Sequence, residues 1–136
     1  MSVVLDSSAL VAVIEDEPEA GAMLQAMAGA SPLYVSTFTV LEARIVMLRR
    51  HGPAAMVKVD RLIDSLGVGI LPFDAEHLRL ATAAYARFGK GIDPRARLNL
   101  GDCVSYALAR SLDAPLLFKG ADFTATDVTP ALPAGA

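Results

Sequence analysis

Short apolar segments alternate with longer amphipathic ones along this chain, a pattern typical of strands that alternate with helices. Residues 3–5 (VVL) are apolar and rich in β-branched side chains, so they predict a buried strand. Similar runs predict three more strands, at residues 33–35, 68–71 and 115–118. Val128 predicts a short fifth strand. Apolar positions three or four residues apart predict helices over about residues 8–14, 18–28, 40–51, 54–66, 74–88 and 101–112.

This order of elements predicts a parallel sheet, because each strand is joined to the next by a helix in a right-handed crossover. The helices then cover both faces of the sheet. We therefore expect an α/β fold, a three-layer α/β/α sandwich around a central parallel sheet of four or five strands. Residues 1–130 are expected to form a single domain, and residues 131–136 (ALPAGA) a flexible C-terminal tail.

The composition indicates a protein with an aliphatic core. The 136 residues are 54% hydrophobic and include no Trp. No apolar run approaches the ~20 residues that a membrane-spanning helix needs, and the first residues lack the basic segment of a signal peptide. Cys103 is the single cysteine, which excludes an internal disulfide, and with two histidines a zinc site is not expected. We expect a cytoplasmic protein with no membrane partner.

Four acidic residues lie where ligands bind in parallel α/β sheets, near the carboxyl ends of the strands. Asp6 directly follows the first strand, and Asp122 lies in the loop after the fourth. Glu42 and Asp102 lie early in predicted helices. We expect these four side chains to face one edge of the sheet, with Asp127 as a fifth candidate.

Each acid also has a purely structural explanation. Asp6 can cap a helix, and Asp102 can favour a helix N-terminus. Asp122 can close an Asx-turn, and Glu42 can pair with an arginine one turn away. Carboxylates that crowd together, however, repel one another and become partly protonated unless a cation neutralises them. Because oxygen ligands without Cys or His favour Mg²⁺ or Mn²⁺ over zinc, the set predicts a site for such an ion.

The segments that carry these acids resemble those of a known family. VLDSSALVAVIEDEP, TVLEARIV, LNLGDCVSYALA and LLFKGADFTATDV are similar to characteristic segments of the PIN-domain ribonucleases of the VapC toxin family, in the same order. The resemblance implies a PIN-like fold and an endoribonuclease that depends on Mg²⁺, for which Mn²⁺ substitutes. It implies that Ser7 orients the first acid and that Asp127 supports the site. The catalytic, metal-binding quartet that it implies is Asp6, Glu42, Asp102 and Asp122.

The same resemblance implies the toxin of a VapBC-type toxin–antitoxin system, which hydrolyses RNA phosphodiester bonds and is neutralised by a cognate VapB-type antitoxin. It also implies a homodimer, with no direct DNA binding in the absence of the antitoxin. Because the net charge is −3, RNA would have to be held by local basic side chains. The candidates, which otherwise belong to solvated helix faces, are Arg44, Arg49, Arg50, Lys90, Arg95, Arg97 and Lys119.

Three alternatives compete with this interpretation. A phosphatase of the haloacid dehalogenase type requires a second aspartate at position 8, where this chain has Ser8. A Mg²⁺-dependent, aspartate-based phosphotransfer domain of the receiver type places its acids differently and needs a late lysine. The third alternative is a catalytically silent PIN-like interaction module. Outside the acidic set, His51 and His77 are expected on helix surfaces and Cys103 in the core.

Overall fold

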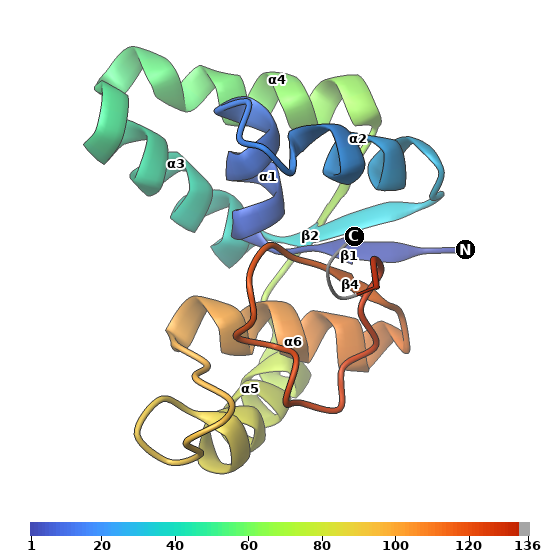
Figure 1. Cartoon of the computed structure of the whole chain (residues 1–136), viewed down its shortest axis with the longest axis vertical. Helices are drawn as coiled ribbons and strands as arrows, with labels where there is room; N and C mark the ends of the chain where they lie inside the picture. Colours follow the sequence, from blue (N-terminus) through green and yellow to red (C-terminus); the bar gives the residue numbers. More distant parts are fainter. Residues whose placement is uncertain (134–136) are drawn as a thin grey trace.

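In the computed structural model, which describes residues 1–133, four parallel strands form one sheet in the order β3–β2–β1–β4 (Figure 1). The strands are β1 (Val3–Leu5), β2 (Leu33–Ser36), β3 (Gly69–Leu71) and β4 (Leu116–Leu117). β1 lies inside the sheet, where Val4 is in register with Tyr34 on one side and with Leu116 on the other. The expected α/β fold with a parallel sheet is confirmed.

Six α-helices and one short 3₁₀ helix connect these strands within the described residues. Figure 1 shows the first four α-helices over one face of the sheet and the last two over the other. The α-helices and the 3₁₀ helix η1 are α1 (Ser7–Ile14), α2 (Ala20–Ala28), α3 (Thr37–His51), η1 (Pro53–Met56), α4 (Val57–Leu66), α5 (Ala75–Phe88) and α6 (Leu100–Leu112).

The alternation of side chains along β1 divides the core into two clusters. Val3 and Leu5 point to the face covered by α1–α4, whereas Val4 points to the face covered by α5 and α6. Val4 and Leu5 are fully buried. Since successive side chains of a strand point to opposite faces, a sheet covered on both sides needs a continuous apolar run. Each fully buried Val or Leu side chain contributes about 1.5–3 kcal/mol.

Three details at the periphery differ from the expectations. Val128 does not form a fifth strand; instead, an isolated parallel bridge joins Leu116 to Pro130. The backbone N–H of Ala131 donates to the carbonyl of Leu116 at 2.8 Å, so the segment expected to be a flexible tail begins with a hydrogen-bonded residue. Residues 134–136 of that segment lie outside the described residues. His77, expected on the surface, is buried beside Phe73.

Among residues 1–133, none of the helices combines the length and the apolar character needed to cross a membrane.

Candidate active site

The acidic residues gather at the carboxyl edge of the sheet. The backbone N–H of Asp6 donates to the carbonyl of Leu117 at 3.0 Å, so Asp6 lies where β1 and β4 both end. Its backbone is extended, and its side chain caps α1. α3 begins directly after β2, and Ser36 at that junction accepts a hydrogen bond from the N–H of Phe38. Strand ends and helix N-termini therefore meet at one edge, where the positive ends of the helix dipoles favour negative charge.

Asp6 is buried, with only 3% of its surface exposed, and both of its carboxylate oxygens are hydrogen-bonded. The Ser105 hydroxyl donates to Oδ1 at 2.6 Å. The Ser8 hydroxyl donates to Oδ2 at 2.6 Å, and the Ser8 N–H donates to the same oxygen at 3.1 Å. Hydrogen bonds to the ionised form offset the free energy that burial of a carboxylate costs. The hydroxyls that donate to Asp6 are thus those of Ser8 and Ser105, not that of Ser7.

Glu42 lies half-buried on α3, with its carboxylate against the backbone of Gly101. A Cβ atom at position 101 would lie 2.5 Å from the carboxyl carbon of Glu42, so only glycine leaves room for it. Burial raises the pKa of Glu42, and the charge of Asp6 raises it further, whereas the Ser7 hydroxyl lowers it. The close approach of α3 and α6 at this point therefore depends on a residue without a side chain.

Asp102 occupies the first turn of α6 and takes part in its N-terminal cap. Its Oδ2 accepts from the N–H of Asn99 at 3.0 Å, while its own N–H donates to Oδ1 of Asn99 at 2.9 Å. This capping box satisfies two N–H groups of the helix end. Asp102 is 8% exposed. Burial raises its pKa to about 7, with further contributions from the charges of Asp6, Asp122 and Glu42.

Asp122 lies exposed in the loop after β4, close enough for its charge to act on Asp102. The start of this loop is tied to the turn after β1, because the Ser8 hydroxyl accepts from the N–H of Lys119 at 3.0 Å. The same hydroxyl donates to Asp6. One serine thus links the turn that carries Asp6 to the loop that carries Asp122.

The four acids fit a hard divalent cation in charge and in donor type. Within residues 1–133, no three His, Cys, Asp or Glu side chains stand together as a ready-made ligand set. No basic side chain of this part of the chain forms an ion pair with any of the four. Their donors are all carboxylate oxygens, which Mg²⁺ and Mn²⁺ prefer. Burial and then the charges of the other three acids raise the pKa of Asp102, and a bound cation would relieve that repulsion.

Asp127 is not part of this group. Its carboxylate accepts from the Tyr106 hydroxyl at 2.5 Å and lies 3.5 Å from Arg87 and 3.9 Å from Arg110. It lines a pocket with Met1 and residues next to the start of β4, at the amino ends of the strands. Burial and then Asp127 raise the pKa of Tyr106 to about 12, so this hydroxyl remains a donor. Asp127 therefore stabilises contacts near the amino ends of the strands and does not contribute to the acidic edge.

The basic candidates divide into paired and unpaired side chains. Arg44 pairs with Asp60, and Arg50 pairs with Glu15. Arg95 lies 3.7 Å from Asp93. In the described part of the chain, three candidates form no ion pair within 4 Å: Arg49, Lys90 and Arg97.

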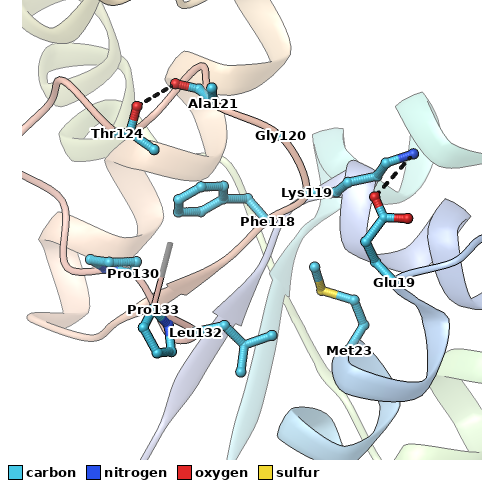
Figure 2. A pocket seen from close by; sticks show the side chains of 10 residues that line it. All are labelled: Glu19, Met23, Phe118, Lys119, Gly120, Ala121, Thr124, Pro130, Leu132 and Pro133. Carbon is cyan, nitrogen blue, oxygen red and sulfur yellow. Dashed lines mark hydrogen bonds and ion pairs between the residues drawn. The ribbon is translucent and has the colours of Figure 1, made fainter. Parts of the chain in front are cut away.

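The Lys119 side chain pairs with two acids just before α2. Its ammonium group pairs with Glu17 and lies 3.7 Å from Glu19. Figure 2 shows this side chain turned toward Glu19, at the rim of a pocket of about 250 Å³ between α2 and the C-terminal segment. The walls of the pocket include Met23, Phe118 and Leu132. The pocket adjoins the loop of Asp122 but contains none of the four acids.

The sequence interpretation missed the polar residues that support the acids. Thr39 and Ser105 are buried beneath them, with Thr39 Oγ1 and Ser105 Oγ 3.5 Å apart. The available signal was their spacing, since Thr39 stands three residues before Glu42 and Ser105 three residues after Asp102. Residues three apart share one face of a helix. Asn99 was also missed, although Asn three residues before Asp102 matches a helix cap.

The chain is similar to known proteins over nearly its whole length. The family described as PIN domain matches residues 3–128. Ribonuclease VapC42 from Mycobacterium tuberculosis is 41% identical over 128 residues, which cover 94% of this chain and 98% of that protein. Ribonuclease VapC from Mycolicibacterium smegmatis is 43% identical over 125 residues, covering 92% of this chain and 96% of that protein.

Solved structures share the fold at lower identity. The crystal structure of VapC20 from Mycobacterium tuberculosis, a Sarcin-Ricin loop cleaving toxin, has a TM-score of 0.77 with 18% identity, covering 93% of this chain and 96% of that one. DNA-bound VapBC from Salmonella typhimurium has a TM-score of 0.71 with 17% identity, covering 96% of both chains.

Proposed function

The chain belongs to the PIN-domain family, and from this premise we propose that it is a metal-dependent endoribonuclease, the toxin of a VapBC-type toxin–antitoxin pair. The observation that carries the proposal is the acidic edge of the sheet, where Asp6, Glu42 and Asp102 come from three different elements. Burial and then the neighbouring acids raise the pKa of Asp102 to about 7, an energetic cost that a bound cation would offset. The proposed place of action is the cytoplasm.

Asp6, Glu42, Asp102 and Asp122 are the residues that would hold the ion. When bound, Mg²⁺ or Mn²⁺ would neutralise charge on the phosphodiester and lower the pKa of a water molecule. The protein's own groups prepare this site. Ser8 and Ser105 orient the Asp6 carboxylate by hydrogen bonds to its two oxygens. Asp102, whose pKa is about 7 without a cation, must be ionised to hold the ion.

RNA cleavage by the purified protein tests the proposal. We expect cleavage with Mg²⁺ or Mn²⁺, none with EDTA, and none by Asp6→Asn with the metal present. Asp64→Asn, a substitution of an exposed aspartate on α4, is the matched control and should cleave like the wild type. Equal cleavage with and without EDTA would exclude a metal nuclease. If no class of RNA is cleaved under any condition, the silent interaction module becomes the better interpretation.

Among the basic candidates, Lys90 and Arg97 are proposed as the main contacts to RNA phosphates. Both lie in the loop between α5 and α6, shortly before the cap of the helix that carries Asp102, and neither is committed to an ion pair within the described residues. An unpaired cation attracts phosphate without first having to leave a carboxylate. Arg44, Arg50 and Lys119 are already paired.

The proposed antitoxin would place a basic side chain against the acids. These acids form no ion pair with residues 1–133, so a cation from a partner would find them uncompensated. Helices α1 and α2 offer the antitoxin little apolar docking surface, because apolar side chains such as Leu10 and Met27 belong to the core. A cognate antitoxin should therefore suppress both the growth arrest caused by this chain and its RNA cleavage in vitro.

The proposed homodimer is supported by an apolar face beside the acidic edge. Leu100 is 68% exposed and forms a ridge between two hollows. One hollow, of about 270 Å³, includes Leu41 and Ile45; the other, of about 810 Å³ between α5 and α6, includes Leu78 and Tyr85. A two-fold interface needs a projection and a recess on the same patch, and this face has both.

Charged substitutions on this face are expected to separate the dimer. The double substitution Ile45→Glu and Leu100→Glu would place four charges in a two-fold interface, so light scattering should give the 14.3 kDa mass of a single chain. Leu24→Glu, at an exposed leucine of α2, is the matched control and should keep the wild-type mass. An unchanged mass of the double variant would exclude this face.

Gly101→Ala is expected to reduce RNA cleavage strongly while stability changes little. The new Cβ would overlap the carboxylate of Glu42, which is the mobile end of a side chain and can turn away. We expect kcat to fall roughly 100-fold, since misplacement of a group by about 1 Å can have such an effect. Thermal unfolding and cleavage kinetics measure both parts. Gly21→Ala, on α2 where a Cβ meets nothing within 4 Å, is the control.

A further inference from the structure

Two hydroxyl groups lie buried directly beneath the carboxylates. Thr39 is fully buried, and Ser105 is 1% exposed. The Ser105 hydroxyl donates to Oδ1 of Asp6 at 2.6 Å, and Oγ1 of Thr39 lies 3.5 Å from Oγ of Ser105. A serine hydroxyl has one proton. Because that proton is given to Asp6, Thr39 is the donor in the second contact, and the chain of hydrogen bonds runs from Thr39 through Ser105 to Asp6.

These hydroxyls belong to the same helices as the acids above them. Thr39 and Glu42 lie one turn apart on α3, and Asp102 and Ser105 lie one turn apart on α6. Residues three apart point to the same side of a helix. The two helices thus face each other through a layer of hydroxyls and a layer of carboxylates, which lies one turn further along α3 and one turn nearer to the N-terminus of α6.

We propose that Ser105 and Thr39 are positioning residues of the nuclease site, an inference that rests on the proposed function. Ser8 orients one oxygen of Asp6 from the adjacent turn, whereas Ser105 is the sole hydrogen-bond partner of the Oδ1 side-chain atom within the described residues. Without Ser105, that oxygen would be buried with no donor, and the carboxylate could rotate about its last bond. Ser105 therefore fixes the plane of the Asp6 carboxylate and, with Thr39, the position of α3 against α6.

The experiment compares Ser105→Ala, Ser105→Thr and Thr39→Val with the full-length wild type. It measures Mn²⁺ affinity by calorimetry, kcat and KM for RNA cleavage, and thermal unfolding. Ser65→Ala is the matched control, because that exposed hydroxyl donates only to the carbonyl of Leu62 within its own helix.

Ser105→Ala is expected to weaken Mn²⁺ binding about 10- to 100-fold and to lower kcat by a similar factor, with KM for RNA nearly unchanged. Ser105→Thr keeps the hydroxyl and should stay within roughly threefold of the wild type. Thr39→Val preserves the shape of the side chain and should give a smaller loss in the same direction. It also tests the proposal if Ser105→Ala does not fold.

A lower unfolding temperature of Ser105→Ala and Thr39→Val with unchanged Mn²⁺ affinity and kcat would mean a purely structural role, and the proposal would be overturned. It would also be overturned if Ser105→Thr lost as much affinity as Ser105→Ala. If the wild type neither binds Mn²⁺ nor cleaves RNA, the proposed function itself fails, and this inference with it. The wild-type measurement therefore distinguishes the two failures.

Discussion

Asp102→Asn is expected to abolish RNA cleavage and to stabilise the metal-free protein at the same time. Burial and neighbouring acids raise the pKa of Asp102 from 3.8 to about 7. At pH 8 its ionised form therefore lowers the free energy of unfolding by about 4 kcal/mol, since one pKa unit corresponds to about 1.4 kcal/mol. Asparagine carries no charge, and its side-chain oxygen can still accept from the N–H of Asn99.

We expect this variant to recover on the order of 2 kcal/mol at pH 8, which is roughly 5 °C or more in Tm. Cleavage should fall at least about 100-fold, because a neutral amide replaces a carboxylate of the proposed cation site. Calorimetry in EDTA measures the first effect and a cleavage assay the second. Asp64→Asn, on the exposed face of α4, should change neither quantity. A variant that is less stable than the wild type and still active would remove Asp102 from the site.

The metal-free protein is expected to lose stability as the pH rises from about 4 to about 7. In this window Asp102 is protonated in the folded state and ionised in the unfolded state, because its folded pKa is about 7 and its ordinary value is 3.8. The folded state thus binds more protons, and the free energy of unfolding falls by up to about 1.4 kcal/mol per pH unit. Glu42, whose pKa is also raised by burial, acts in the same direction.

Two other acids do not hide this trend. The pKa values of Glu15 and Asp93 are lowered, Glu15 first by its hydrogen bond to His51 and Asp93 first by the N–H of Arg95. The stability that such groups contribute is complete above their ordinary pKa and is lost below it. The change in unfolding free energy that Glu15 and Asp93 cause therefore occurs at lower pH, largely outside the window in which Asp102 titrates.

Adding Mg²⁺ should reverse the loss at pH 8 and have little effect at pH 5. Cation binding requires ionised carboxylates, and an ion that binds the folded state alone stabilises it. At 100 times the dissociation constant the gain is about 2.7 kcal/mol. Thermal unfolding at both pH values, with and without Mg²⁺, measures this. An equal gain at pH 5 and pH 8, or a Tm that rises with pH in EDTA, would contradict the assignment of the site.

Much of the fold follows from local pattern. The run VVL is apolar throughout because β1 is buried on both faces, and such a run can be recognised without any other part of the chain. The order of strands and helices was predictable for the same reason. Val128 was assigned to a strand because it is apolar, but the pairing at this edge uses Pro130 instead. Pairing at a sheet edge depends on where a loop returns, which local pattern does not contain.

The acids themselves were also accessible from the sequence, since Asp6 follows a strand and Asp102 stands in the first turn of a helix. Their structural and chemical explanations proved compatible: Asp6 caps α1, and Asp102 completes the cap of α6, while both face the same edge. A carboxylate has about four lone-pair sites, so one side chain can cap a helix and still bind a cation.

The partners of these acids depend on contacts between residues that are distant in the sequence. Ser105 reaches Asp6 across 99 positions, and Glu42 rests on Gly101 from a different helix. His77 is buried although its neighbours in the sequence place it on a helix exposed over most of its surface. Which acidic residues form the candidate site can be recognised from short segments of the sequence. Their pKa values, their orientation and the separation of Asp127 from them arise only when α3, α6 and β1 pack together, because burial and charge–charge repulsion depend on distance in space.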